Sequence, residues 1–380
     1  MARNRSPVAS VLWTLLFLVA LVGAAFPWLT DRWDEWSTTL QDQAATIAPV
    51  VPGVPELGES ASLLIVVQDA DGRAASIVLG SVSEAGKPVF VIIPNSIFTL
   101  LPGFGEFRIS ETMRFEDEQL TRVTVENLLG ARIDNVLALR IGDVARAVGT
   151  PIEVDVSSAL TVRDENNQTR VVIDAGPQIL DGTQIETLLF TRGESDLLTW
   201  TQRQSSAWAA ILGDIRLRPG AAESLAGQGI KAEALIALAQ QPRVVLVPAM
   251  PVATGSAGEG FTISGVDAEA FVISRIPSLK LFDAPRPRVE LLNGNGRIQA
   301  TRSVAEALIR NGFRIVRTDN ADNFDFEKTI VVAQGRSRQR AAEEVARILA
   351  VSEVLLELDT PSGVVDISII VGQDIDSGEG

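Results

Sequence analysis

The chain has 380 residues, of which 46% are hydrophobic, and its 48 acidic and 33 basic side chains give a net charge of −15. It contains no Cys, His or Tyr, which excludes disulfides, thiol nucleophiles, Ser-His-Asp relays and His-ligated metal sites. Any catalysis would therefore depend on carboxylates, arginines, hydroxyls or a hard cation held by oxygen ligands. The acidic balance argues against a nucleic-acid-binding protein.

An uncharged apolar stretch spans residues 8–29 and follows a short basic N-terminus, residues 1–7. A helix of this length, rising about 1.5 Å per residue, crosses a hydrocarbon core of about 30 Å. The basic residues before it and the acidic cluster after it predict a single-pass anchor in the cell membrane, with a cytoplasmic N-terminus and an extracytoplasmic remainder. A cleaved signal peptide is the alternative, because Val22-Gly23-Ala24 forms a small-residue site. The apolar run continues past that site, which favours a retained anchor.

Residues 30–60 combine a polar stretch with Pro and Gly, and predict a juxtamembrane spacer. A larger domain is expected over residues 61–282. Its apolar run at 63–67 ends in Asp69-Ala70-Asp71-Gly72, which predicts a buried strand and a hairpin into 74–78. Further patterns predict strands at 88–93, 135–140, 152–156 and 170–173 and helices at 121–129, 141–148, 203–212 and 232–239. This mixture predicts an α/β domain with a mixed sheet.

A composition break at residues 283–287 predicts a linker to a second domain, residues 288–374. There, a strand at 289–292, an amphipathic helix at 298–310 and a strand at 313–318 form a β-α-β unit. The pattern recurs in outline with strands at 329–333, 354–357 and 364–371 and a helix at 337–349. The sequence therefore predicts a small α/β domain built of β-α-β units, followed by an acidic tail at 375–380.

The second domain resembles the C-terminal domain of LytR-type cell-envelope proteins. The resemblance lies in residues 289–296 (Val-Glu-Leu-Leu-Asn-Gly-Asn-Gly), 305–308, Gly312-Phe313, Asn320-Ala321-Asp322 and 366–374 (Asp-Ile-Ser-Ile-Ile-Val-Gly-Gln-Asp). More faintly, the larger domain resembles the LytR-CpsA-Psr catalytic domain in Ile93-Pro94, 124–129 (Thr-Val-Glu-Asn-Leu-Leu), Ile133-Asp134-Asn135, 176–182 and Arg203-Gln204. That resemblance implies a family that transfers polyprenyl-pyrophosphate-linked glycopolymers onto peptidoglycan with a bound Mg²⁺.

Such chemistry needs arginines that hold the pyrophosphate and acidic residues that hold the metal. Where the family reads Pro-Arg-Asp, this chain has Pro94-Asn95-Ser96. Of the family's later arginine-rich signature it keeps Arg192, Arg203 and Gln204, and Asp196 lies one position from the expected acid. Because each charge-assisted contact contributes about 1.5–3 kcal/mol, these losses together predict a degenerate, non-catalytic domain, a pseudoenzyme.

Three functions follow from this interpretation. In the favoured one, the chain is a membrane-anchored envelope protein without a cofactor, which binds wall glycopolymer, lipid-linked precursor or an envelope partner through Arg192, Arg203 and Gln204. In the second, it is an active Mg²⁺-dependent phosphotransferase in which Ser96, Asp196, Arg192 and Arg203 replace the family's site. In the third, it is a scaffold that recruits such a transferase. For Arg192 and Arg203 themselves, an ordinary role as solvated or salt-bridged helix residues is favoured over ligand binding.

Three other signals have a structural and a functional interpretation. The turn Asn293-Gly294-Asn295-Gly296 lies between a strand and a helix, where free amides attract anions, but a tight turn is favoured. Asp181 precedes an apolar helix and is expected to cap it, in preference to serving as a catalytic acid. Arg336, Arg338 and Arg340 are expected to form a solvated basic face, with binding of wall anions as the alternative.

Overall fold

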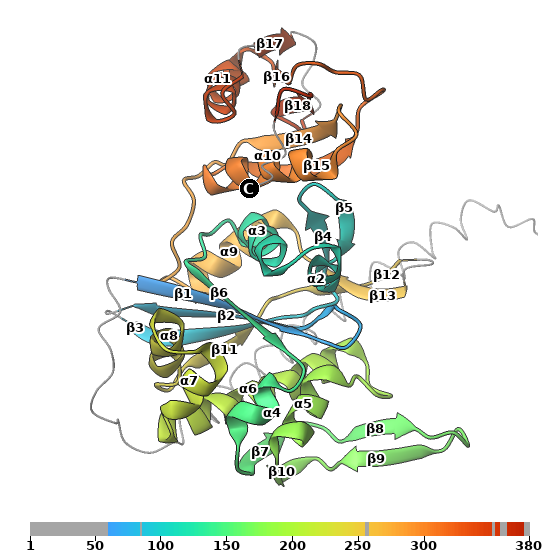
Figure 1. Ribbon diagram of the computed structural model, residues 1–380, viewed down its shortest axis with the longest axis vertical. Coiled ribbons are helices and arrows are strands. Elements are labelled where there is room, and N and C mark those ends of the chain that lie inside the picture. Colours follow the sequence, from blue (N-terminus) through green and yellow to red (C-terminus); the bar gives the residue numbers. More distant parts are fainter. Residues whose placement is uncertain (1–59, 84–85, 255–257, 352–353, 358–362, 376–380) are drawn as a thin grey trace, which may run out of the picture. The chain divides into compact units, whose positions relative to one another are not determined.

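The computed structural model describes residues 60–83, 86–254, 258–351, 354–357 and 363–375 (Figure 1). The predicted anchor, residues 8–29, nearly all of the predicted spacer and most of the acidic tail lie outside these ranges. Within them, no helix combines the length and the apolar character needed to cross a bilayer.

The larger domain is built on a five-stranded mixed sheet with the strand order β11-β3-β2-β1-β6. Strand β2 pairs antiparallel with β1 and with β3, whereas β6 and β11 add in parallel to β1 and β3 at the two edges. The strands are β1 (Ser60–Gln68), β2 (Ala74–Ser83), β3 (Gly86–Ile93), β6 (Asn135–Arg140) and β11 (Arg243–Leu246). The expected mixed sheet is confirmed.

Helices cover both faces of this sheet, which explains why its strands read as continuous apolar runs. In β1, Leu63, Ile65 and Val67 face one core, and Leu64 and Val66 face the other. The first core is closed by α4 (Asp143–Val148), α5 (Gly182–Phe190), α6 (Leu197–Leu217), α7 (Gly220–Ala226) and α8 (Ile230–Leu238). The second is closed by η1 (Ile109–Glu111), α2 (Thr112–Phe115), α3 (Glu118–Leu129) and α9 (Gly265–Arg275).

Among its described residues, the larger domain also contains four two-stranded sheets outside its five-stranded sheet. They join β4 (Phe98–Leu101) to β5 (Gly105–Arg108), β7 (Ile152–Val156) to β10 (Gly176–Leu180), β8 (Leu160–Arg163) to β9 (Thr169–Ile173), and β12 (Met250–Thr254) to β13 (Gly258–Thr262). All eight strands have only four or five residues. This is too few to show a clear hydrophobic period, and several of them were not predicted.

The C-terminal domain has a second five-stranded sheet, ordered β15-β14-β18-β16-β17. Its elements are β14 (Arg288–Asn293), α10 (Ile298–Arg310), β15 (Arg314–Asn320), β16 (Ile330–Gln334), η3 (Arg336–Arg338), α11 (Gln339–Ile348), β17 (Val354–Glu357) and β18 (Ile367–Val371). Both predicted β-α-β units are present, as parallel pairs β14-β15 and β16-β17. Helices α10 and α11 share a single core with the inward residues of the strands, so they cover one face of the sheet.

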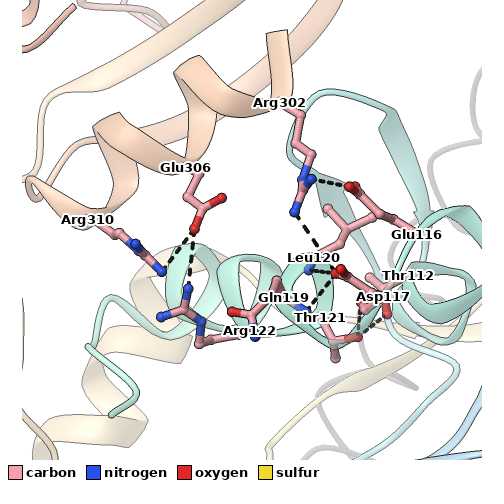
Figure 2. Close-up of polar contacts among 10 residues, drawn as sticks. All are labelled: Thr112, Glu116, Asp117, Gln119, Leu120, Thr121, Arg122, Arg302, Glu306 and Arg310. Carbon is pink, nitrogen blue, oxygen red and sulfur yellow. Dashed lines mark hydrogen bonds and ion pairs between the residues drawn. The ribbon is translucent and has the colours of Figure 1, made fainter. Parts of the chain in front are cut away.

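Charged side chains connect α10 to the region around α3 (Figure 2). Arg302 forms ion pairs with Glu116 and with Asp117, the residue that caps α3. Glu306 accepts from Arg122 of α3 at 3.3 Å and from Arg310 of its own helix at 2.9 Å. A chain of opposite charges therefore lies between the two helices.

Two buried residues complete this contact. The Asn127 side chain donates to the Ile315 carbonyl at 2.9 Å and accepts from the Ile315 amide at 3.0 Å. It thus pairs with edge strand β15 as a neighbouring strand would. Arg286 donates to the carbonyls of Asn127 and Phe313 at 3.1 and 2.9 Å, and burial lowers the pKa of its guanidinium to about 10.

Candidate functional site

Two residues from the family-like motifs meet at one carbonyl oxygen at the start of β2. Asn95 follows β3 and donates from Nδ2 to the Ala75 oxygen at 2.7 Å. Gln204 on α6 donates from Nε2 to the same oxygen at 2.8 Å and to the Leu189 oxygen at 2.7 Å. Both side chains are buried. Their hydrogen bonds join β3, β2, α5 and α6, so Gln204 contributes to internal structure here.

Arg203 lies one residue earlier on α6 and is fully buried. Its guanidinium donates to the Ser195 hydroxyl and the Arg192 carbonyl, each at 2.6 Å. Longer contacts of 3.4–3.5 Å reach Ser158, Ala159 and Thr191. Burial lowers the pKa of the guanidinium, and the nearby Asp196 opposes part of that effect. Through these hydrogen bonds, Arg203 holds the segment that connects α5 to α6 in place.

Arg192 and Asp196 belong to that same connecting segment. Arg192 donates from Nε to the Ser195 carbonyl at 2.7 Å and forms an ion pair with Glu259 of β13 at 3.0 Å. Its side chain is 41% exposed, so it retains contact with solvent. Asp196 caps α6 by accepting from the amide and the hydroxyl of Thr199, both at 2.8 Å. Burial would raise the pKa of Asp196, but these hydrogen bonds outweigh it and hold the pKa below its usual range.

Ser96 lies on the same side of the larger domain, against β13. Its carbonyl accepts from the Phe261 amide at 3.1 Å, and the residue is buried. A side chain at Gly260 would collide with this carbonyl, since a Cβ there would lie 2.8 Å from it. The structure therefore brings Ser96, Arg192, Asp196, Arg203 and Gln204 into one region, each with contacts inside the protein.

The described residues contain no cluster of three acidic side chains suited to a metal ion. The carboxylates of Asp196 and Glu259 both interact with these arginines. Asp196 is engaged by its helix cap, and Glu259 is paired with Arg192. Because these groups already serve other partners, they do not form the oxygen-ligand set that Mg²⁺ requires.

Two of the other sequence signals, the turn at 293–296 and Asp181, take their structural interpretation. In the turn at 293–296, the amide of Gly294 donates to Val371, and the amides of Asn295 and Gly296 donate to the Asn293 side chain. Asp181 forms a capping box with Gln184 on α5. Of the three arginines near α11, Arg338 pairs with the buried Asp366 at 3.0 Å.

Sequence reasoning missed a groove between hairpin β4-β5 and the C-terminal sheet. The groove has a volume of about 780 Å³ and is lined by Leu100, Glu106, Glu290, Val316, Arg317, Thr318, Gln334, Val364, Val365 and Ser368. The alternation along β14 and β18 carries a signal for it, because Glu290 and Ser368 stand between buried apolar neighbours. Such positions point away from the core that α10 and α11 cover.

Comparison with known proteins identifies the C-terminal domain. Residues 286–374 match the family described as LytR cell envelope-related transcriptional attenuator. The expected LytR-type C-terminal domain is thereby confirmed. A search of curated proteins finds no match to the chain.

Solved structures show a remote similarity over the larger part of the chain. TagV of B. subtilis is 16% identical with a TM-score of 0.47, over 57% of this chain and 95% of that one. TagT bound to LIIa-WTA is 18% identical with a TM-score of 0.48, over 61% and 96%. A LytR-Csp2A-Psr enzyme from Actinomyces oris is 17% identical with a TM-score of 0.44, over 62% and 97%.

Proposed function

We propose that this chain is a cell-envelope protein whose larger domain is a non-catalytic, LytR-CpsA-Psr-like module. It binds wall glycopolymer, a polyprenyl-linked precursor or another envelope protein, and residues 8–29 hold it in the cell membrane with the two domains outside. The envelope context is supported by the family match of the C-terminal domain. The resemblance of the larger domain's motifs to the transferase family supports the class of ligand.

The burial of Arg203 carries the non-catalytic part of the proposal. A phosphoryl-transfer site needs guanidinium N–H groups directed at the substrate phosphates. Both terminal nitrogens of Arg203 instead make their 2.6 Å contacts inside the protein, to Ser195 and to the Arg192 carbonyl. A phosphate would have to displace these contacts and enter a site with no exposure to solvent. Arg192 is half-exposed and is the better candidate for an anion contact.

The active phosphotransferase is the second candidate, because Ser96, Asp196, Arg192 and Arg203 lie in one region. It would require the Asp196 cap and the Arg192–Glu259 pair to open when substrate binds. A scaffold that recruits another transferase is the third candidate, and it would use surfaces outside this region.

Turnover and binding of a polyprenyl-pyrophosphate analogue distinguish these candidates. The full chain in detergent micelles is titrated with the analogue, with and without Mg²⁺, beside Arg192→Ala and an Arg163→Ala control at an exposed ion pair. Binding without release of polyprenyl phosphate, weakened by Arg192→Ala alone, is the expected result. Mg²⁺-dependent release would establish a transferase instead. Absence of binding to the analogue and to purified wall polymer would leave the scaffold.

A further inference from the structure

We infer that the groove between hairpin β4-β5 and the C-terminal sheet binds an uncharged oligosaccharide. This inference rests on the proposed function and gives wall-polymer binding a site and a ligand class. The groove's volume of about 780 Å³ lies in the usual range for small-ligand sites, about 300–1,000 Å³. It is large enough for a short stretch of a glycan chain.

A row of fixed polar groups crosses the sheet on the side of the groove. The Glu290 carboxylate accepts from Arg317 at 2.8 Å and from the Ser368 hydroxyl at 3.0 Å. Ser368 in turn accepts from Gln334 at 3.3 Å. These side chains come from four neighbouring strands, β15, β14, β18 and β16. Because each orients the next, the row presents donors and acceptors in set positions, as recognition of sugar hydroxyls requires.

Two further polar groups have hydrogen-bonding capacity to spare. The Thr318 hydroxyl is buried, and it has no hydrogen-bond partner among the described residues. Glu106, on the hairpin side, is exposed. A buried hydroxyl without a partner costs about 1–3 kcal/mol, so a ligand that supplies one gains that amount. Sugar hydroxyls both donate and accept, and they suit a carboxylate on one wall and a threonine on the other.

The apolar lining and the charge of the groove select the kind of sugar. Leu100, Val316, Val364 and Val365 offer surfaces on which the C–H faces of a pyranose ring can pack. Glu106 and Glu290 are opposed by a single guanidinium, Arg317, which already pairs with Glu290 and Asp319. The lining is therefore net negative, and it repels phosphate-bearing polymers more than neutral glycans.

The walls of the groove are held at a fixed spacing. A Cβ at Gly103, in the β4-β5 turn, would lie 3.0 Å from Arg302 of α10. The same Arg302 pairs with Glu116, the C-cap residue of α2. Hairpin and C-terminal domain are thus in close contact beside the groove, and a ligand meets a cavity that is already formed.

Titration calorimetry of the full chain in detergent micelles with chitohexaose, a neutral β-1,4-linked N-acetylglucosamine hexamer, tests the inference. Glu106→Ala is expected to weaken binding about tenfold and Thr318→Val about threefold to tenfold, by loss of one hydrogen bond each. Glu165→Ala removes an exposed carboxylate from the β8-β9 turn and is the matched control. Circular dichroism melting curves show that each variant folds.

Each result has a set meaning. Binding of chitohexaose that falls in both groove variants but not in the control supports the site. The inference is overturned if chitohexaose does not bind, or if it binds equally to wild type, the two groove variants and the control. Preferential binding of a glycerol-phosphate oligomer or of a cationic peptide in the groove also overturns it. Purified wall polymer is titrated in parallel. If it binds equally to wild type and groove variants, the proposed function stands and this inference fails; if neither ligand binds, both lose their support.

Discussion

Replacing Asn127 by alanine is expected to loosen the C-terminal domain from α3. The asparagine side chain makes two hydrogen bonds with the Ile315 backbone, at 2.9 and 3.0 Å, and only 5% of the residue is exposed. Its removal leaves a buried amide and a buried carbonyl without partners. At about 1–3 kcal/mol for each of the two groups, the docked arrangement should lose about 2–6 kcal/mol. Local opening would then become about 30- to 20,000-fold more frequent, since 1.4 kcal/mol corresponds to a factor of ten.

Hydrogen exchange of the full chain, followed by mass spectrometry, measures how often this contact opens. Peptides covering β15 and the C-terminal half of α3 should exchange faster in Asn127→Ala, whereas peptides from the β1-β2-β3 sheet should not change. Asn166→Ala, at an exposed turn, is the control. Asn127→Asp keeps an acceptor for the Ile315 amide but sets a buried carboxylate against the Ile315 carbonyl, so it should loosen the contact at least as much as alanine does. Unchanged exchange in β15 would refute the role assigned to these hydrogen bonds.

Three further predictions concern the ionisable groups. Arg203→Ala should lower the unfolding free energy by about 3 kcal/mol or more, because two 2.6 Å contacts to a buried cation are lost. Arg192→Ala should cost at most about 1 kcal/mol, because its ion pair is partly exposed. Urea denaturation followed by tryptophan fluorescence compares the two variants. Burial would raise the pKa of Asp366, but its hydrogen bonds with Arg288 hold this pKa below its usual value. The contribution of Asp366 to folding stability is therefore present above the unfolded-state pKa, near 4, and is lost as pH falls through the folded pKa. Asp366→Asn should cost about 1–3 kcal/mol of unfolding free energy at pH 7 and little at pH 2. Burial raises the pKa of Glu126. The contribution of Glu126 to folding stability is therefore present at low pH and is lost as pH rises through the folded pKa. Glu126→Gln should stabilise the chain by about 1 kcal/mol at pH 7.5, and a variant no more stable than wild type at that pH would contradict this.

Hydrophobic periodicity sufficed for the long elements. The helix at 298–310 and the strand at 135–140 have the expected bounds. Gly312 follows α10 with φ +88°, a left-handed conformation that glycine adopts readily. Helix α6 begins at Leu197, six residues before the predicted start at Arg203, because Asp196 supplies its N-cap. Strands such as β4, β5 and β8 have four residues each, and their pairing depends on partners that periodicity does not reveal.

The candidate site shows a different limit. Asn95 and Gln204 were singled out in separate motifs, and the structure shows that both donate to the Ala75 carbonyl. The sequence did not show that Arg203 would be fully buried. The sequence pattern around a helical arginine is the same whether its guanidinium lies in solvent or is buried among backbone carbonyls. Nor did the sequence show Arg286 as buried: that residue lies in the predicted linker, yet it bridges the Asn127 and Phe313 carbonyls.

The contact between α3 and α10 also constrains the scaffold alternative. A recruiting helix would present its charged face to a partner, but Arg302 and Glu306 of α10 already pair with Glu116 and Arg122. Arg122 and Arg302 have side chains only 12% and 20% exposed, so a partner competing for α10 would have to break these ion pairs and expose the apolar residues beneath them. Val123 of α3 is one of these, since it packs in the core of the C-terminal domain. Recruitment would therefore use another face of the domain, and a charge reversal such as Glu306→Arg should disturb the chain's own stability before it alters binding to a second protein.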